Sequence, residues 1–548
     1  MAQASAQAVP FLILKEGTKR TLGKEAYDVN IAAAKVLSEV LKTSLGPRGL
    51  DKMLVDSLGD VTITGDGATI LKEMEINHPA AKMLVEVAKA QDAEVGDGTT
   101  TVVVLAGELL KKAEDLLLQN IHPTIIIDGY RKALEYVMNE IDRLAIKLDK
   151  NDIETLKKVV MTSMYSKAIS EYKEKLADLA IQACLQVAEE INGELKINPD
   201  YIKLEKRKGK SLDETELIKG LVIDKEVVHP GMPKLVKGAK IAVINAPLEI
   251  EKPEISSKIS ITSPEQMKSF LDEETKILAK MVDKLASVGA NVVICQKGID
   301  DTAQFLLKKK NILAVRRVKE SDMEKIARAT GARIITDIED IKPEDLGYAD
   351  LVEERKIGEE KMLFIEGCKN PKAVTILIRG GSELIVDEAE RALRDAIYVC
   401  KNSLEKKKLL PGGGAIEASL ALKVRDFSKS LPSKEQLAAM KFAEALEVVP
   451  SILAETAGMD PIDSIVKLRA LHSEGKYTYG VNVLEGIIAD MAKTGVLDPA
   501  NVKLQAIKAA TEAAIMILRI DDIISAAPSK PEKEKEKREG KEEGVGAY

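Results

Sequence analysis

The sequence predicts a multidomain protein in which helical regions at both ends of the chain flank a central α/β domain. The chain has 548 residues, too long for a single hydrophobic core, and this length indicates about three or four domains. Hydrophobic residues make up 45% of the chain but aromatic residues only 3%, so its cores are mainly aliphatic and suit helix packing. Strand and helix patterns alternate between residues 220 and 372, which is typical of an α/β domain.

The first 150 residues contain mainly amphipathic helices. Apolar residues recur at helical spacing in residues 30–41, 78–93, 102–119 and 124–146. Short β-type runs at residues 53–55 and 61–64 predict a hairpin, and Phe11-Leu-Ile-Leu14 predicts a further strand. A helical link at residues 151–192 then leads into the middle of the chain.

The middle of the chain predicts strands at residues 240–244, 290–295, 312–315 and 332–335, with helices at 300–309 and 321–330. A polar segment at residues 251–263 interrupts this pattern and leads into a long helix at 264–287. Met267, Phe270 and Leu271 give that helix an apolar stripe. Two interpretations remain open: the helix faces the core, or it is a projecting arm that offers apolar residues to a partner.

Helical patterns return at residue 382 and dominate residues 415–518, before a short predicted strand at 520–524. The tail at residues 528–548 is dense in Lys, Glu and Gly, and we expect it to be disordered. These features complete the predicted multidomain α and α/β fold.

The charge and cysteine content exclude several classes of protein. The 81 basic and 88 acidic residues nearly balance, and the chain has no basic stripe of the kind that would indicate a nucleic-acid partner. The four cysteines have no paired spacing, which indicates neither a zinc site nor a disulfide framework. With no signal peptide and no apolar run of membrane-spanning length, we expect a cytoplasmic protein. The high content of both charges is also a tendency of hyperthermophile proteins.

One short segment carries the strongest functional signal. Glu94-Val-Gly-Asp-Gly-Thr-Thr-Thr101 places a carboxylate, two glycines and three hydroxyls in one turn, ahead of a helix that we expect to begin near Val102. Glycines let backbone N–H groups approach an anion, and the N-terminus of a helix favours negative charge. Asp97 can hold a hard cation through oxygen. The segment predicts a phosphate and magnesium site, although an ordinary capped turn remains an alternative.

Two upstream segments have the same character. Thr43-Ser-Leu-Gly-Pro-Arg-Gly49 and Thr62-Ile-Thr-Gly-Asp-Gly-Ala-Thr-Ile70 are Gly-rich turns with hydroxyl side chains. The sequence contains no P-loop, no Gly-x-Gly-x-x-Gly dinucleotide turn and no kinase signature. A different nucleotide-binding fold is therefore indicated.

These three segments together resemble the nucleotide-binding signature of the chaperonins. The second half of the chain agrees, in the family's order, through Glu390-Arg-Ala-Leu-Arg-Asp-Ala396, Leu410-Pro-Gly-Gly-Gly-Ala415, Tyr479-Gly-Val-Asn482 and Val496-Leu-Asp-Pro-Ala500. The resemblance covers nearly the whole chain and is greatest to the archaeal, group II type. Bacterial chaperonins usually have Lys where this chain has Gly65, and they lack an insertion like residues 251–287.

The resemblance implies three domains in a nested order. It implies a mainly helical equatorial ATP-binding domain from residues 1–152 and 408–527, and a small α/β intermediate domain from residues 153–222 and 376–407. It also implies an α/β apical domain at residues 223–375, with a helical protrusion near 251–287 that serves as a built-in lid.

The resemblance also implies a set of site residues for ATP or ADP and Mg²⁺. Asp97 would ligate magnesium, and Asp66 and Asp395 would orient and deprotonate the attacking water. The remaining residues would bind the nucleotide: Gly98, Thr99, Thr100 and Thr101 at the β and γ phosphates, Leu45, Gly46 and Pro47 beside the α phosphate, Gly413 and Gly414 at adenine or ribose, Asp498 at the ribose hydroxyls, and Asn482 and the nucleotide-sensing Lys167.

The implied activity is ATP hydrolysis coupled to protein folding in two stacked rings. The implied partners are identical or sister subunits and non-native client proteins, with no separate lid protein, nucleic acid or membrane. Two other readings remain open on the residues alone: a metabolic ATP-dependent enzyme whose central domain binds a small substrate, and a binding protein without ATP turnover that uses the arm at residues 251–287.

Overall fold

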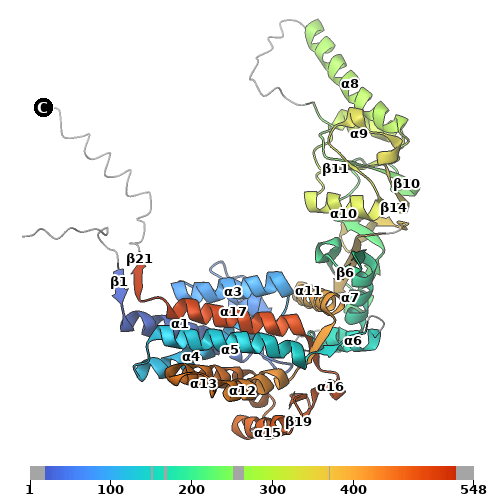
Figure 1. Ribbon diagram of the computed structural model, residues 1–548. Coiled ribbons are helices and arrows are strands. Elements are labelled where there is room, and N and C mark those ends of the chain that lie inside the picture. The colour runs from blue at the N-terminus through green and yellow to red at the C-terminus, as the bar shows by residue number, and fades with distance from the viewer. Residues whose placement is uncertain (1–18, 150–151, 166–169, 251–263, 370, 526–548) are drawn as a thin grey trace, which may run out of the picture.

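The computed structural model describes residues 19–149, 152–165, 170–250, 264–369 and 371–525 (Figure 1). Four predicted features lie outside these residues: the strand at residues 11–14, Lys167, the first part of the insertion at residues 251–263, and the charged tail. The described residues build three large hydrophobic cores. Among them, no helix is both long and apolar enough to cross a membrane.

The first core lies in a helical body that is made from both ends of the chain. The N-terminal part contributes α1 (Lys24–Lys42), α2 (Gly67–Glu73), α3 (Pro79–Val95), α4 (Thr99–Leu118) and α5 (Pro123–Leu144). The C-terminal part contributes α12 (Ala415–Ser428), α13 (Ser433–Leu446), α14 (Val448–Thr456), α15 (Pro461–Ser473), α16 (Met491–Thr494) and α17 (Ala500–Leu518). In Figure 1 the blue helix α3, the light blue to cyan helices α4 and α5 and the red helix α17 stack together, although about 400 residues separate α4 from α17.

Apolar side chains at helical spacing explain this packing. On α5, Ile126, Tyr130, Ala133 and Val137 recur every three or four residues and are buried. The hydroxyl of Tyr130 donates to the carbonyl of Leu109 at 2.8 Å, which satisfies its one polar group inside the core. The helices predicted for the first region are thus confirmed, with ends that differ by a few residues.

Short strands fasten the helical body. β1 (Lys19–Leu22) pairs with β21 (Asp522–Ser525) and joins the two ends of the described chain. The predicted hairpin is confirmed as β2 (Lys52–Val55) and β3 (Val61–Thr64). Two further small sheets pair strands that the sequence did not indicate: β4 (Ile146–Lys147), β17 (Lys408–Pro411) and β20 (Leu497–Pro499) in one, and β18 (Tyr479–Asn482) with β19 (Ile487–Asp490) in the other.

The second core surrounds a seven-stranded mixed sheet in the middle of the chain. Its strand order is β12-β11-β10-β14-β15-β9, with β13 paired beside β10. The predicted strands are confirmed as β10 (Leu235–Ile244), β11 (Val292–Cys295), β12 (Leu313–Val315) and β13 (Ile334–Ile335), which are parallel where they pair. The antiparallel strands β9 (Gly220–Ile223), β14 (Gly347–Ile357) and β15 (Glu360–Glu366) were not predicted.

Three helices accompany this sheet: α8 (Pro264–Ser287), α9 (Asp301–Lys309) and α10 (Glu320–Thr330). The two interpretations of α8 each describe half of it. Leu278, Val282 and Leu285 in its second half are buried in the core. Met267 and Phe270 in its first half are 50% and 41% exposed, and α8 projects beyond the sheet in Figure 1.

The third core lies between the helical body and the mixed sheet (Figure 1). It contains α6 (Ile153–Thr162), α7 (Lys173–Val187) and α11 (Glu383–Lys406). They pack on a sheet in which β16 (Val374–Gly380) lies between β7 (Ile202–Lys208), which is parallel to it, and β8 (Glu216–Ile218). The hairpin β5 (Glu189–Ile191) and β6 (Glu194–Lys196) completes this region.

Candidate functional site

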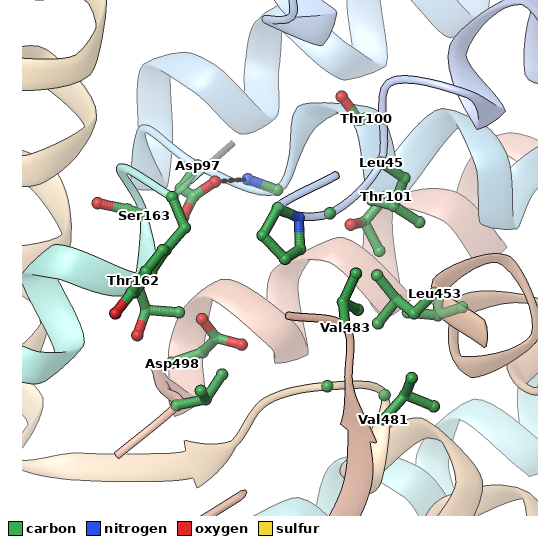
Figure 2. A pocket seen from close by; sticks show the side chains of 18 of the residues that line it. Leu45, Asp97, Thr100, Thr101, Thr162, Ser163, Leu453, Val481, Val483 and Asp498 are labelled. Atoms are coloured by element: carbon green, nitrogen blue, oxygen red, sulfur yellow. Dashed lines mark hydrogen bonds between the residues drawn. The ribbon is translucent and has the colours of Figure 1, made fainter. Parts of the chain in front are cut away.

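The turn between α3 and α4 has the geometry of an anion site. Gly96 ends α3 in the left-handed conformation, with φ 71°, and Gly98 precedes α4 with φ 81°. Glycine adopts this region without steric cost, so two such positions around Asp97 make the sharp reversal possible. Asp97 Oδ1 accepts a hydrogen bond from the N–H of Gly98 at 2.6 Å (Figure 2).

The helix α4 begins at Thr99, three residues earlier than predicted. The first intrahelical bond runs from the N–H of Val102 to the carbonyl of Gly98 at 3.0 Å. The N–H groups of Thr99, Thr100 and Thr101 therefore belong to the first turn, where a helix offers them no acceptor of its own. The three hydroxyl residues lie on the helix itself, at its positive end, and not in the preceding turn.

A cavity of about 510 Å³ opens at this turn, a size in the range of ligand pockets, which is about 300–1,000 Å³. Its walls come from both ends of the chain and from α11. Every predicted site residue in the described part of the chain lines it: Leu45, Gly46, Pro47, Asp66, Asp97, Gly98, Thr99, Thr100, Thr101, Asp395, Gly413, Gly414, Asn482 and Asp498.

The second Gly-Asp-Gly turn contacts the first. Asp66 caps α2, because its Oδ2 accepts hydrogen bonds from the N–H and the hydroxyl of Thr69 at 2.8 and 2.7 Å. A Cβ placed on Gly67 would fall 2.4 Å from Thr100 Oγ1, so only glycine allows α2 to start this close to α4. Two sequence segments about 30 residues apart thus form one wall.

The opposite side of the cavity is apolar. Leu453, Val481 and Val483 lie across from Asp97 in Figure 2, and Met491 also lines this part. The turn between β17 and α12 contacts this wall, because the N–H of Val481 in β18 donates to the carbonyl of Gly413 at 2.8 Å. The cavity therefore has a polar end with carboxylate and hydroxyl groups and an apolar end that suits a flat ring.

A largely buried cation, Lys503, lies beside Asp498. Lys503 Nζ lies 2.9 Å from Glu417 Oε1 and 3.2 Å from Asp498 Oδ2. Burial alone would lower the pKa of Lys503, but the two carboxylates outweigh it and raise that pKa above its usual value. Lys503 is thus a fixed positive charge on the cavity wall, and it holds the Asp498 carboxylate in place.

The sequence missed several lining residues. Lys503 sits on a helix rich in Ala and Ile, and no local pattern distinguishes it from a surface lysine. Val481, Val483 and Met491 resemble any core residue. Thr162 and Ser163 lie at the end of α6. The resemblance of this segment to the family was noted, but only Lys167 was predicted from it as a site residue.

The described residues of the site do not form a complete metal cage of protein ligands. In the described ranges, no group of three or more His, Cys, Asp or Glu side chains is placed to hold a metal ion. A cation at Asp97 would therefore share its coordination with ligand oxygens and water, which is how Mg²⁺ is usually held at phosphates.

Comparison with known proteins agrees with this geometry. Residues 37–528 match the model of the TCP-1/cpn60 chaperonin family. The chain belongs to this family. It is 59% identical over 540 residues to the thermosome subunit alpha of Archaeoglobus fulgidus, an alignment that covers 98% of this chain and 99% of that protein. It is 58% identical over 547 residues to a thermosome subunit of Pyrococcus horikoshii, covering 100% and 99%.

The thermosome subunit alpha of Sulfolobus acidocaldarius is 60% identical over 551 residues, covering 98% of each chain. The resemblance to group II chaperonins is therefore confirmed over nearly the full length. The predicted chaperonin fold, with helical and α/β parts, is confirmed as well. The roles of the individual site residues in this chaperonin stay predictions.

Proposed function

We propose that this chaperonin is an ATP-dependent chaperone, the subunit of a double ring that encloses non-native proteins and promotes their folding. One observation carries the proposal. A single cavity collects the Gly-Asp-Gly turns of the N-terminal part, the Gly-rich turn of the C-terminal part and Asp395 of α11. A ligand bound there would contact the helical body and also the ends of α6 and α11 beside the third core, so its binding and cleavage can change how these parts sit on each other.

The polar end fits a triphosphate. We assign the phosphates to the N–H groups and hydroxyls of Thr99, Thr100 and Thr101, at the positive end of α4. Asp97 would hold Mg²⁺, which when bound neutralises charge on the phosphate oxygens. Leu45, Gly46 and Pro47 lie along the same cavity and would contact the α phosphate.

The apolar end fits adenine and ribose. Val481, Val483 and Leu453 would pack on the base, with Gly413 and Gly414 providing a close backbone approach. Asp498 would accept hydrogen bonds from the ribose hydroxyls, since the contact with Lys503 at 3.2 Å holds its side chain in place. Asn482 lines this part of the cavity too.

Hydrolysis needs a proton acceptor for the attacking water. We assign this role to Asp395, which reaches the cavity wall from α11. The water oxygen forms a bond to the γ phosphorus, the bond to the bridging β-γ oxygen breaks, and the proton passes to Asp395. Asp66 would help to orient the water. Lys167, predicted as a nucleotide sensor, lies outside the described residues.

The three cores support the proposed domains. We assign the equatorial domain to residues 1–152 and 408–527, the intermediate domain to 153–222 and 376–407, and the apical domain to 223–375. The projecting first half of α8 would belong to a built-in lid that needs no separate lid protein. The relatives are named as thermosome subunits, which supports an assembly of identical or sister subunits.

The test is turnover by Asp395→Ala. We expect the rate of ATP hydrolysis to fall at least about 100-fold while the affinity for ADP stays within about threefold, because Asp395 acts on the water and not on nucleotide binding. Asp426→Ala, which removes an exposed carboxylate of α12, is the matched control and should keep normal turnover. Unchanged turnover in Asp395→Ala would overturn this assignment.

A further inference from the structure

The helix α11 meets the helical body at the turn that carries Asp97 (Figure 1). Asp395, Tyr398 and Asn402 are spaced three and four residues apart, so they share one face of α11. Asp395 lines the cavity beside Asp97. The other two residues of this face contact the α3–α4 turn itself.

Asn402 is buried and bridges two helices of the body. Its side-chain N–H donates to the carbonyl of Val95, the last residue of α3, at 3.0 Å. Its side-chain oxygen accepts from Asn501 at the start of α17, at 2.9 Å. The carbonyls in the last turn of a helix lack intrahelical partners, and α11 supplies the partner here.

Tyr398 rests directly on the turn. A Cβ placed on Gly96 would fall 2.3 Å from both Cβ and Cγ of Tyr398, closer than any side chain allows. The next residue, Asp97, is also held in place, because the side chain of the fully buried Gln91 donates to its carbonyl at 2.9 Å. The turn is therefore clamped between Gln91 on one side and Tyr398 and Asn402 on the other.

We propose that Tyr398 and Asn402 are positioning residues for the reaction, which hold α11 on the α3–α4 turn and so set the place of Asp395 relative to Asp97. This inference rests on the proposed function. Neither residue needs to touch the nucleotide. Their effect is geometric: Asp395 lies one and two helical turns away from the contacts that fix α11, so a loosened contact displaces the carboxylate from the water that it must deprotonate.

The first test replaces Asn402 by Leu, which has a similar shape but cannot hydrogen-bond. In the full-length chain we expect the rate constant of ATP hydrolysis to fall at least about tenfold, with the affinity for ADP changed less than about threefold. Ser403→Ala is the matched control. Ser403 is buried on the same helix but donates only to the carbonyl of Val399 within α11. Loss of its hydroxyl should lower the stability of the protein without lowering the rate of hydrolysis relative to the affinity for ADP.

The second test does not depend on Asn402. Gly96→Ala should slow hydrolysis, because the new methyl group collides with Tyr398 and the backbone is strained. Adding Tyr398→Gly, which removes both the Cβ and the ring that collide, should restore part of that rate if the collision displaces α11. Normal hydrolysis in Asn402→Leu, or rate losses that simply multiply in the double variant, would overturn the inference while the proposed function stands. No ATP hydrolysis by the unaltered chain would overturn both.

Discussion

Lys503 on α17 donates to Glu417 on α12 over 2.9 Å, in a place where the Glu417 side chain is only 2% exposed. The second oxygen of Glu417 has no hydrogen-bond partner in the described part of the chain. The pair therefore depends on a single lysine to compensate a buried negative charge. It also connects the packing of two helices to Asp498 at the wall of the cavity.

The first prediction concerns this lysine. Lys503→Met leaves Glu417 buried without its cation, and we expect the free energy of unfolding to fall by about 3–5 kcal/mol, the usual cost of breaking a buried pair. Urea denaturation followed by circular dichroism measures this loss. Lys493→Met removes a lysine that is 82% exposed and should change stability by less than about 0.5 kcal/mol. Equal stability of the two variants would contradict the role of Lys503.

The second prediction concerns pH. Burial would raise the pKa of Glu447, but hydrogen bonds and charges from Arg469 and Arg425 outweigh it and hold that pKa below its ordinary value of 4.5. A carboxyl group whose pKa is lower in the folded state stabilises the protein at pH values above its unfolded-state pKa. This contribution is lost as the pH falls through its folded-state pKa. Glu447→Gln loses charge-assisted hydrogen bonds to two arginines that reach solvent, so it should be destabilised by about 1–3 kcal/mol at pH 7. The gap to the unaltered protein should narrow below about pH 4.5; a gap that stays constant down to pH 3 would rule out this account.

The third prediction concerns the hairpin of β2 and β3. Leu58 at its tip is 86% exposed, and Met53 and Val55 are more than half exposed, which is an unusual apolar surface for a short hairpin. If the hairpin seals neighbouring subunits by edge pairing, Leu58→Asp should shift the protein from rings toward monomers without loss of helix content. Analytical ultracentrifugation measures the shift. Leu118→Asp, at the exposed end of α4, is the control and should assemble normally.

The same sizing experiment separates the proposed function from a small metabolic enzyme. With eight or nine chains of 59.6 kDa in each ring, the proposed double ring would have a mass of about one megadalton. If the unaltered chain forms monomers or dimers and no larger assembly under any condition tested, the small metabolic enzyme would be favoured instead.

The fourth prediction concerns the projecting half of α8. Met267, Phe270 and Leu271 are 50%, 41% and 51% exposed. Replacing Met267 and Phe270 by Ser should weaken suppression of aggregation of a denatured client protein several-fold, because apolar contact or closure at this arm is lost. Basal ATP hydrolysis should remain, since the cavity is distant in the sequence and the fold. Lys276→Ser on the same helix is the control, and an unchanged double variant would argue against a role of this surface.

Much of the fold could be predicted from sequence periodicity. The helices of the body have strong apolar spacing, and their predicted ranges agree with α1, α3, α4 and α5. The strand β7 (Ile202–Lys208) was missed because its last four residues are all charged and because its partner, β16, lies about 170 residues later in the sequence. Such pairing depends on contacts distant in sequence, which local patterns cannot reveal.

The polar half of the site was predictable for a different reason. The turns around Asp66 and Asp97 need glycine for their geometry and hydroxyls for their chemistry, so the requirement is visible within a few residues. The apolar half was not, because Val481 and Met491 are defined only by what they face. The role of Tyr398 and Asn402 likewise could not be predicted, because it depends on the contact of α11 with the α3–α4 turn, which is distant in sequence.

The most direct measurement is the structure of the full-length chain with Mg²⁺ and a non-hydrolysable ATP analogue. We predict that the γ phosphate lies at the first turn of α4, within hydrogen-bond distance of Thr99 to Thr101, with the metal ion at Asp97 and the base against Val481 and Val483. A triphosphate bound anywhere else on the chain would contradict the central claim that this cavity is the site of ATP hydrolysis.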